Sequence, residues 1–240
     1  MMGTVSLEVR NLKKYFNTPR GLLHAVDNVD FSIEAGKTLG VVGESGCGKS
    51  TLGRVILHLL ESTGGQILFE GKDVTHVSRA QLRALREDMQ IIFQDPYSSL
   101  NPRMSVSEII MEPLFLKGGM SRADMHRETK RLMDTVGLAE RLENAYPHEL
   151  DGGRRQRIGI ARALALNPKF IVCDEPVSAL DVSIQAQVLN LMLDLQEERK
   201  LTYIFITHDL SVVKYFSDDI MVMYLGQVVE KAPSYLLFAN

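Results

Sequence analysis

The run GESGCGKST at residues 43–51 constrains this chain more than any other feature of its sequence. It follows the continuous apolar run TLGVVG, which predicts a strand buried on both faces, and a helix is expected to begin near Lys49. A loop of the form GxxxxGK followed by Ser or Thr, between a strand and a helix, binds phosphate because its backbone N–H groups and the helix N-terminus surround an anion. We therefore predict a phosphate site within an α/β fold.

Each residue of this loop, residues 43–51, hereafter the P-loop, is a candidate nucleotide ligand. Lys49 can reach the β and γ phosphates of a nucleoside triphosphate, and the Ser50 hydroxyl can bind Mg²⁺. Cys47, between two glycines, is expected to fill the loop as a small side chain. The full set of predicted ligands is Gly43, Glu44, Ser45, Gly46, Cys47, Gly48, Lys49, Ser50 and Thr51.

The segment FIVCDEP supplies an acidic pair that complements this loop. Residues 170–173 predict a buried strand, which brings Asp174 to its carboxyl end, where ligands of open parallel sheets collect. Asp174 can hold the Mg²⁺ shell, and Glu175, which points in a different direction, can polarise an attacking water. An acidic pair alone usually lies at a solvated turn, so this interpretation depends on the P-loop.

The periodicity of the outer segments predicts strands. Alternation at residues 7–9 and 29–33 favours half-exposed antiparallel strands, and STGGQILFEGKDV favours a hairpin with Gly64 and Gly65 at its turn. Towards the C-terminus, the apolar runs KFIVCDEP, LTYIFITH and DIMVMYLGQVVE alternate with a long and a short helical segment. Such alternation is typical of a parallel sheet.

The middle of the chain predicts helices. Residues 78–165 are mainly helical in pattern, and Ser121 is placed to cap a helix that ends near Val136. The predicted fold class is α/β: a P-loop NTPase core with a mostly parallel sheet, an N-terminal antiparallel β subdomain and an inserted α-helical subdomain at about residues 95–165. We expect residues 1–240 to form a single domain.

Composition excludes several classes of function. A formal net charge of -3 gives no basic excess for binding nucleic acid. The two cysteines are far apart in the sequence and have no CxxC pairing, so neither a disulfide framework nor a zinc site is indicated. No run approaches the roughly 18 apolar residues that cross a bilayer, so any role at a membrane is expected to depend on a partner.

Four further motifs carry a resemblance to a known family. Gln94 follows the apolar MQIIF, LDGGRRQR begins at residue 150, SALD ends at Asp181, and ITHD contains His208. In order and spacing they resemble the Q-loop, signature, D-loop and H-loop of ABC ATPases, and the resemblance covers essentially the whole chain. It implies ATP and Mg²⁺ as the bound groups, and a nucleotide-binding domain of a transporter as the function.

The resemblance also implies roles for single residues. Gln94 would bind Mg²⁺ and the attacking water while sensing the transport partner, and His208 would contact the γ phosphate and help to hold Glu175 and the water. Phe16 would stack on adenine, with Tyr15 as the nearby alternative. The ligands that act in trans, on ATP held by a second subunit, would be Asp151, Gly152, Gly153 and Asp181.

Members of this family work as assemblies. The implied partners are a second nucleotide-binding subunit in a homo- or heterodimer, two transmembrane permease subunits and, indirectly, an extracytoplasmic substrate-binding protein, with no nucleic acid. This places the chain at the cytoplasmic face of a prokaryotic cell membrane. Segments such as FQDPYSSLNPRMSV resemble the dipeptide, oligopeptide and nickel uptake group, with peptide as the expected cargo. Because members usually continue past a segment like SYLLFAN, we expect a truncated form.

The signature departs from the usual LSGGQ, because Asp151 replaces the serine and Arg154 the glutamine. A serine hydroxyl donates a hydrogen bond to the γ phosphate, whereas an ionised carboxylate only accepts and adds a like charge. The aspartate should still cap the following helix. We expect the site completed by this signature to close weakly. Such a signature would be explained by a heterodimer with one degenerate site or by engineering of the sequence. The alternative is that Asp151 turns outward and the backbone N–H groups of Gly152 and Gly153 suffice to bind the phosphate.

Two other classes of function stay open at this point. A soluble ABC ATPase that acts on DNA or ribosomes usually carries a long coiled-coil insertion or a tandem second ATPase domain, and this sequence has neither. A regulatory module that holds ATP and barely hydrolyses it is favoured only by Asp151. Measurement of ATP turnover separates that module from a transporter motor.

Overall fold

The run TLGVVG forms β3 (Thr38–Gly43) inside a six-stranded sheet of the computed structural model, which describes residues 4–239. The strand order is β10-β9-β3-β8-β7-β6. Strands β6, β7, β8, β3 and β9 run parallel to one another, and β10 pairs antiparallel with β9 at the edge. The remaining strands of this sheet are β6 (Met89–Ile92), β7 (Phe170–Asp174), β8 (Thr202–Ile206), β9 (Asp219–Tyr224) and β10 (Gln227–Pro233). The mostly parallel sheet predicted from the sequence is confirmed.

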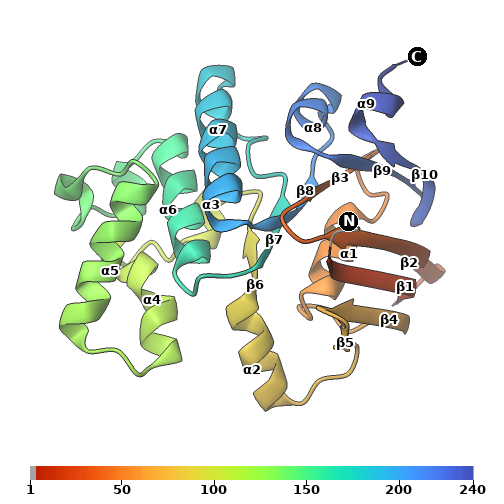
Figure 1. The fold of residues 1–240 in the computed structure, drawn as a ribbon, viewed down its shortest axis with the longest axis horizontal. Helices are drawn as coiled ribbons and strands as arrows, with labels where there is room; N and C mark the ends of the chain where they lie inside the picture. The colour runs from red at the N-terminus through yellow and green to blue at the C-terminus, as the bar shows by residue number, and fades with distance from the viewer. Residues whose placement is uncertain (1–3, 240) are drawn as a thin grey trace.

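A second sheet is formed by the N-terminal part of the chain, as Figure 1 shows. Its order is β2-β1-β4-β5 and every pairing in it is antiparallel. The apolar residues of the predicted alternation turn inward, because Leu7, Val9 and Val29 are at most 1% exposed. The strands are β1 (Val5–Thr18), β2 (Gly21–Glu34), β4 (Gly64–Phe69) and β5 (Lys72–Asp73). The predicted antiparallel subdomain is therefore present.

The turn of the β4–β5 hairpin lies elsewhere than predicted. The chain reverses at Glu70 and Gly71, which both have positive φ (48° and 76°). Gly65 instead lies inside β4 with a φ of 88°, where a Cβ atom would come within 2.3 Å of the Asn11 carbonyl oxygen. The prediction that Gly64 and Gly65 form the turn is wrong, because the glycine at 65 serves a close approach to β1.

The part of the chain that connects β6 to β7 forms helices, which lie beside the parallel sheet (Figure 1). Ser121 accepts the N–H of Asp124, as the sequence predicted, and Ser105 caps α4 through a capping box that was not predicted. These helices are α3 (Pro96–Ser99), α4 (Val106–Lys117), α5 (Arg122–Thr135) and α6 (Gly152–Leu164), with short 3₁₀ turns at Glu140–Leu142 and Pro147–Glu149. Their common apolar core explains why they stay together.

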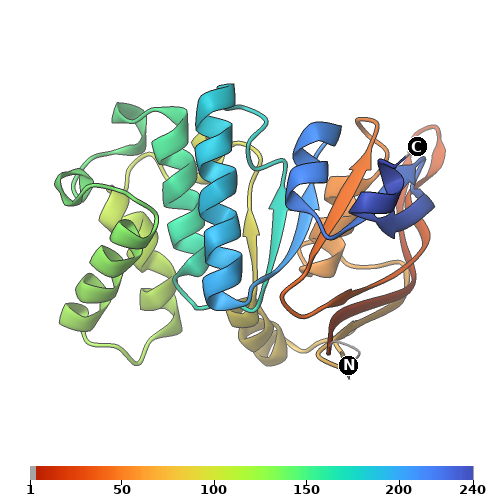
Figure 2. The ribbon, with the colours of Figure 1, turned by 45° about the horizontal axis from the view of Figure 1, so that its top comes forward.

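The remaining helices lie around the parallel sheet. Figures 1 and 2 both show α7 and α8 beside one face of this sheet. They are α1 (Lys49–Ile56), α2 (Arg79–Asp88), α7 (Val182–Arg199), α8 (Leu210–Phe216) and α9 (Ser234–Leu237). Within residues 4–239, no helix is long and apolar enough to cross a membrane.

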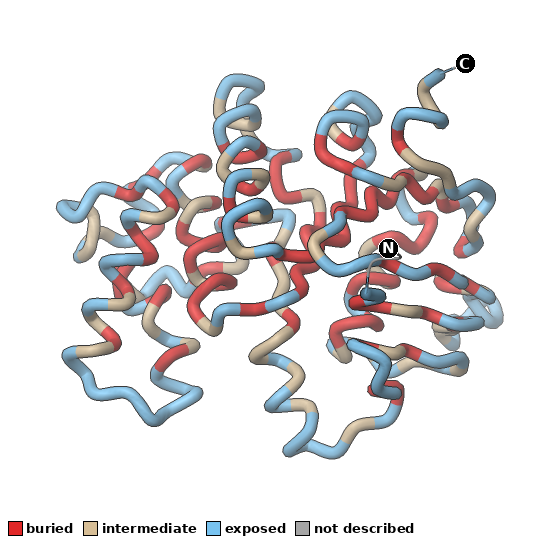
Figure 3. The backbone as a smooth tube through the Cα atoms, viewed as in Figure 1, coloured by how far each residue is buried: buried red, intermediate tan, exposed pale blue. Residues whose placement is uncertain are grey.

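Alternation along β7 joins two separate cores. Ile171 and Cys173 belong to the core shared with α6 and α7, whereas Phe170 and Val172 belong to the core shared with α1 and the N-terminal sheet. All four side chains are fully buried. Figure 3 shows buried chain concentrated along these central strands. The carboxyl end of β7 is therefore held rigidly from both faces.

Helix α1 (Lys49–Ile56), which follows the P-loop, lies against β7 through a glycine. A Cβ atom on Gly53 would come within 2.8 Å of Val172 Cγ1 and 3.1 Å of Ile206 Cδ1. These contacts are stiff, because both side chains are buried in central strands. The missing side chain at residue 53 therefore sets the distance between α1 and the sheet.

We expect Gly53→Ala to lower the free energy of unfolding by about 1–3 kcal/mol, since the new methyl group overpacks this contact. The matched control is Gly159→Ala in α6, where a Cβ atom would have no neighbour within 4 Å. There the gain in helix propensity should leave stability unchanged or raise it by up to about 1 kcal/mol. Urea denaturation measures both; equal effects of the two substitutions would contradict the tight contact.

Candidate functional site

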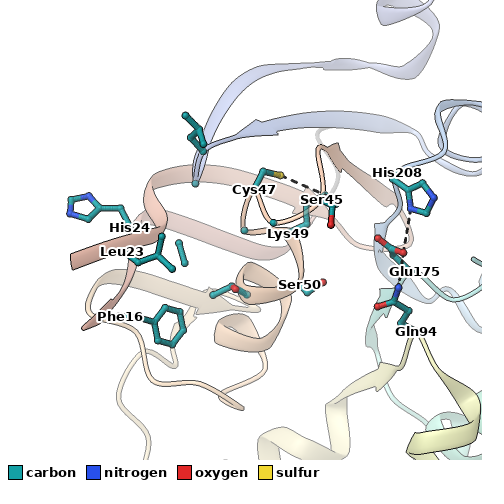
Figure 4. Close-up of a pocket in the computed structure, with 16 residues that line it drawn as sticks. Phe16, Leu23, His24, Ser45, Cys47, Lys49, Ser50, Gln94, Glu175 and His208 are labelled. Carbon is teal, nitrogen blue, oxygen red and sulfur yellow. Dashed lines mark hydrogen bonds and ion pairs between the residues drawn. The ribbon is translucent and has the colours of Figure 1, made fainter. Parts of the chain in front are cut away.

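An open pocket of about 680 Å³ lies at the carboxyl ends of the parallel strands, around the P-loop. Figure 4 shows Phe16, Leu23 and His24 on one side of the P-loop and a polar group of side chains on the other. The lining residues are Phe16, Leu23, His24, Ala25, Ser45, Gly46, Cys47, Gly48, Lys49, Ser50, Thr51, Gln94, Glu175, His208, Leu225 and Gly226. The structure thus brings together residues that lie far apart in the sequence, since Phe16 and Gly226 are separated by 210 positions.

Backbone contacts from two other segments fix the P-loop. Gly48 has a φ of 110°, and a Cβ atom there would come within 2.0 Å of the Ala25 carbonyl oxygen of β2. The Gly226 N–H donates to the Cys47 carbonyl over 2.9 Å, and the Asp27 N–H of β2 donates to the Gly226 carbonyl over 2.8 Å. The loop is therefore held by β2 and by the turn that joins β9 to β10, which also contact each other.

Lys49 places a buried positive charge beneath the loop. The residue is 5% exposed, and its ammonium group donates to the carbonyl oxygens of Gly43 and Glu44, both over 2.8 Å. Ser45 and Gly46 are exposed above it, and a Cβ atom on Gly46 would meet no atom of the described chain within 4 Å. A cation below a glycine loop with open space above fits a polyphosphate.

Ser50 and Asp174 meet at the end of β7. The Ser50 hydroxyl donates to Asp174 Oδ1 over 2.6 Å, and Asp174 is 2% exposed. Burial raises the pKa of the Asp174 carboxyl, against the opposing effects of the Ser50 hydrogen bond and the Arg54 guanidinium. A hydroxyl and a buried carboxylate are oxygen donors of the kind that Mg²⁺ prefers, so the residues fit this ion.

Three neighbouring strands each deliver one polar side chain to the same point. Gln94 follows β6, Glu175 follows β7 and His208 follows β8, and these strands are adjacent in the sheet. Gln94 Nε2 donates to Glu175 Oε2 over 2.9 Å, and His208 Nδ1 lies 3.3 Å from the same oxygen. Figure 4 shows the three side chains in a row. Their proximity, expected from the strand ends, is present in the structure.

Glu175 has a left-handed backbone conformation with a φ of 47°. Such a conformation is uncommon outside glycine and needs support from its surroundings. Its N–H donates to the Ile206 carbonyl over 2.9 Å, at the end of β8. This contact turns the chain after Asp174, so that two consecutive carboxylates serve different points: Asp174 faces Ser50, and Glu175 faces Gln94 and His208.

Of the two candidate aromatic residues, only Phe16 lines the described part of the pocket. The Tyr15 ring stacks on His24 with a centroid separation of 4.0 Å, and its hydroxyl donates to Asp27. Sequence reasoning missed five other lining residues, Leu23, His24, Ala25, Leu225 and Gly226. They reach the pocket through strand pairing and a hairpin turn that local patterns do not specify.

The signature and D-loop residues lie apart from this pocket. Its lining, as far as residues 4–239 describe it, includes none of Asp151, Gly152, Gly153 and Asp181. Asp151 caps α6 as predicted: its carboxylate accepts the N–H of Arg154 over 2.8 Å and lies 3.5 Å from the Arg154 guanidinium. The carboxylate is thus turned towards its own helix, beside a partly exposed cation.

Comparisons with known proteins agree with this geometry. The family model described as "ABC transporter" matches residues 26–178. The chain is 56% identical to the oligopeptide transport ATP-binding protein OppF of Bacillus subtilis strain 168, over 98% of this chain and 77% of that protein. It is 52% identical to AppF, named an oligopeptide transport ATP-binding protein of the same organism, over 98% of this chain and 74% of that one.

A solved structure shares the fold. The ATP-binding cassette MJ0796, described as a dimer in a post-hydrolysis state bound to ADP and Pi, superimposes with a TM-score of 0.87 at 29% identity. The match covers 95% of this chain and 98% of that one. The predicted fold, with an antiparallel sheet, a mostly parallel sheet and a helical region, is confirmed by this likeness.

Asp27 links two parts of the site: the β1–β2 hairpin, which carries Phe16, and the β9–β10 turn. Hydrogen bonds from Tyr15 and from Gln227, the latter over 3.1 Å, hold the pKa of Asp27 below its usual value. A carboxyl whose pKa is lower in the folded state adds stability above its unfolded pKa, near 3.9, and loses it as pH falls through the folded value.

We therefore expect Asp27→Asn to lower the thermal midpoint at neutral pH, and this deficit should shrink as pH falls below about 4. Asp194→Asn on the exposed face of α7 is the control for loss of one carboxylate and should leave the thermal midpoint at neutral pH close to that of the unaltered protein. Thermal denaturation between about pH 3 and pH 8, which spans the titration of carboxyl groups, measures both variants. A deficit of constant size at all pH values would contradict the charge interaction.

Proposed function

This chain belongs to the ABC transporter family, and we propose that it is the ATP-binding and ATP-hydrolysing subunit of an importer that takes up peptides across the cytoplasmic membrane. The family and the ATPase class predicted from the sequence are confirmed by the family model and the relatives. One observation carries the proposed mechanism: Gln94, Glu175 and His208 converge beside the P-loop in a single pocket.

Within this site, Glu175 is the proposed general base. Gln94 and His208 both contact its Oε2 atom, so they orient the carboxylate while Oε1 is available to accept the proton of an attacking water. Lys49 and the P-loop N–H groups hold the phosphates, and Phe16 stacks on the base. Ser50, Asp174 and Gln94 are the proposed holders of Mg²⁺, which when bound neutralises charge on the phosphates.

A second nucleotide-binding subunit is proposed to complete the site. Asp151, Gly152, Gly153 and Asp181 lie outside the pocket that their own chain forms, so they can reach a nucleotide only across an interface. MJ0796, which shares this fold, is described as a dimer. Closure of two subunits around ATP and reopening after hydrolysis would then drive two permease subunits at the cytoplasmic face of the membrane.

Peptide is the proposed cargo because relatives more than half identical over nearly the whole chain are named for oligopeptide transport. This support is by association, since the permeases and an extracytoplasmic binding protein would select the cargo rather than this chain. The relatives' names favour oligopeptide over the dipeptide and nickel alternatives. A co-transcribed binding protein whose pocket fits an oligopeptide would support the proposal.

We expect Glu175→Gln to reduce ATP hydrolysis by about 100-fold or more, because the amide cannot accept the proton of water. ATP binding should persist, since the P-loop contacts are unchanged. Glu197→Gln on the exposed face of α7 is the matched control and should retain full turnover. Steady-state phosphate release and calorimetric titration with ATP measure the two properties; undiminished hydrolysis would reject Glu175 as the base.

The signature LDGGR generates a separate prediction about closure. An aspartate at this position of the signature adds like-charge repulsion towards a γ phosphate across the interface even with its carboxylate turned to its own helix, and the Arg154 guanidinium 3.5 Å away only partly offsets it. In a Glu175→Gln background, the double variant Asp151→Ser, Arg154→Gln should dimerise with ATP at least about tenfold more tightly than the unaltered signature. Light scattering with and without ATP measures this, and equal dimerisation would reject weakened closure.

A further inference from the structure

Arg54 is the cation that faces the buried carboxylate of Asp174. Its Nη2 atom lies 3.7 Å from Asp174 Oδ2, whereas Oδ1 accepts the hydrogen bond from Ser50. The ammonium group of Lys49 is directed to two P-loop carbonyl oxygens instead. From the α1 side, therefore, Arg54 is the cation placed to balance the charge of Asp174.

The position of Arg54 follows from the helix. Ser50 and Arg54 are four residues apart in α1, so they lie on the same helix face one turn from each other. Gly53 lets this face approach β7, at whose end Asp174 lies. The same helix turn thus presents a hydroxyl and a guanidinium to the two oxygens of one carboxylate.

The two members of this ion pair differ in burial. The Asp174 side chain is 3% exposed and the Arg54 side chain 50% exposed. A separation of 3.7 Å is also longer than a direct hydrogen bond. The guanidinium can therefore move into water on its flexible stem at little cost, whereas the carboxylate cannot leave its buried position.

We propose that Arg54 is a positioning residue that occupies the electrostatic role of Mg²⁺ at Asp174 until Mg·ATP binds, and that it opposes the binding of a divalent cation without nucleotide. The inference rests on the proposed function, because it assumes that Asp174 belongs to a nucleotide-linked metal site. Arg54 is then a cation from α1 itself that competes with the metal ion for Asp174.

The physical consequence is a coupling between metal and nucleotide. A free divalent cation that approaches Asp174 meets the positive charge of Arg54, 3.7 Å from that carboxylate. The negative charge of bound nucleotide phosphates offsets this repulsion, so metal is retained mainly together with nucleotide. When no metal is bound, Arg54 supplies the counter-charge of the buried Asp174 carboxylate and so stabilises the folded structure.

The test uses Mn²⁺ as the probe, with free Mn²⁺ followed by its electron paramagnetic resonance signal. Arg54→Gln should bind Mn²⁺ in the absence of nucleotide roughly three- to tenfold more tightly than the unaltered protein, and the affinity gained by adding ADP should shrink correspondingly. Arg54→Lys, which keeps the charge, should stay close to the unaltered protein. In EDTA, the thermal midpoint should fall for Arg54→Gln and not for the same change in an Asp174→Asn background.

The matched control is Arg122→Gln, which removes the same charge at the start of α5, far from α1 in Figure 1. It should leave Mn²⁺ affinity unchanged. Unchanged or weaker Mn²⁺ binding by Arg54→Gln would overturn the proposal, and so would equal destabilisation in both backgrounds. If the unaltered protein binds no nucleotide at all, the proposed function itself fails, which distinguishes the two failures.

Discussion

The close packing of three backbone segments at Gly48 is the constraint on which the rest of this site depends. The P-loop packs against β2 and against the β9–β10 turn, and the contact with β2 leaves no room for a side chain at Gly48. Because both flanking segments belong to sheets with buried cores, the loop inherits their rigidity. Its shape is thus determined by long-range structure as much as by its own glycines.

The geometry of the parallel sheet accounts for the polar half of the site. Strands β6, β7 and β8 are neighbours and end at the same edge, so the residues that follow them must lie close together. The left-handed conformation of Glu175 then separates the two carboxylates by function. One faces the helix that follows the P-loop, and the other faces the side chains that follow β6 and β8.

The sequence predicted the features that depend on local order along the chain. The P-loop, the acidic pair and the residues Gln94 and His208 all follow apolar strands, and this placement is visible in the sequence itself. The choice of Phe16 over Tyr15 came from the family resemblance and not from local order, because β-bulges shift the register of β1 against β2 between Leu12 and Tyr15 and so interrupt simple alternation. Leu225 was missed for a related reason, since a hairpin turn brings it to the pocket from the end of the chain.

The pocket is built by two sheets with different tasks. The antiparallel sheet contributes Phe16, Leu23 and His24 at one end, and the parallel sheet contributes the residues after β6, β7 and β8 at the other. In the proposed site, contacts with the nucleobase and contacts with the phosphates therefore come from two different sheets that share one apolar core. Exchange of the exposed hairpin side chains would then change the surface offered to the base while Gln94, Glu175 and His208 keep their places after the parallel strands.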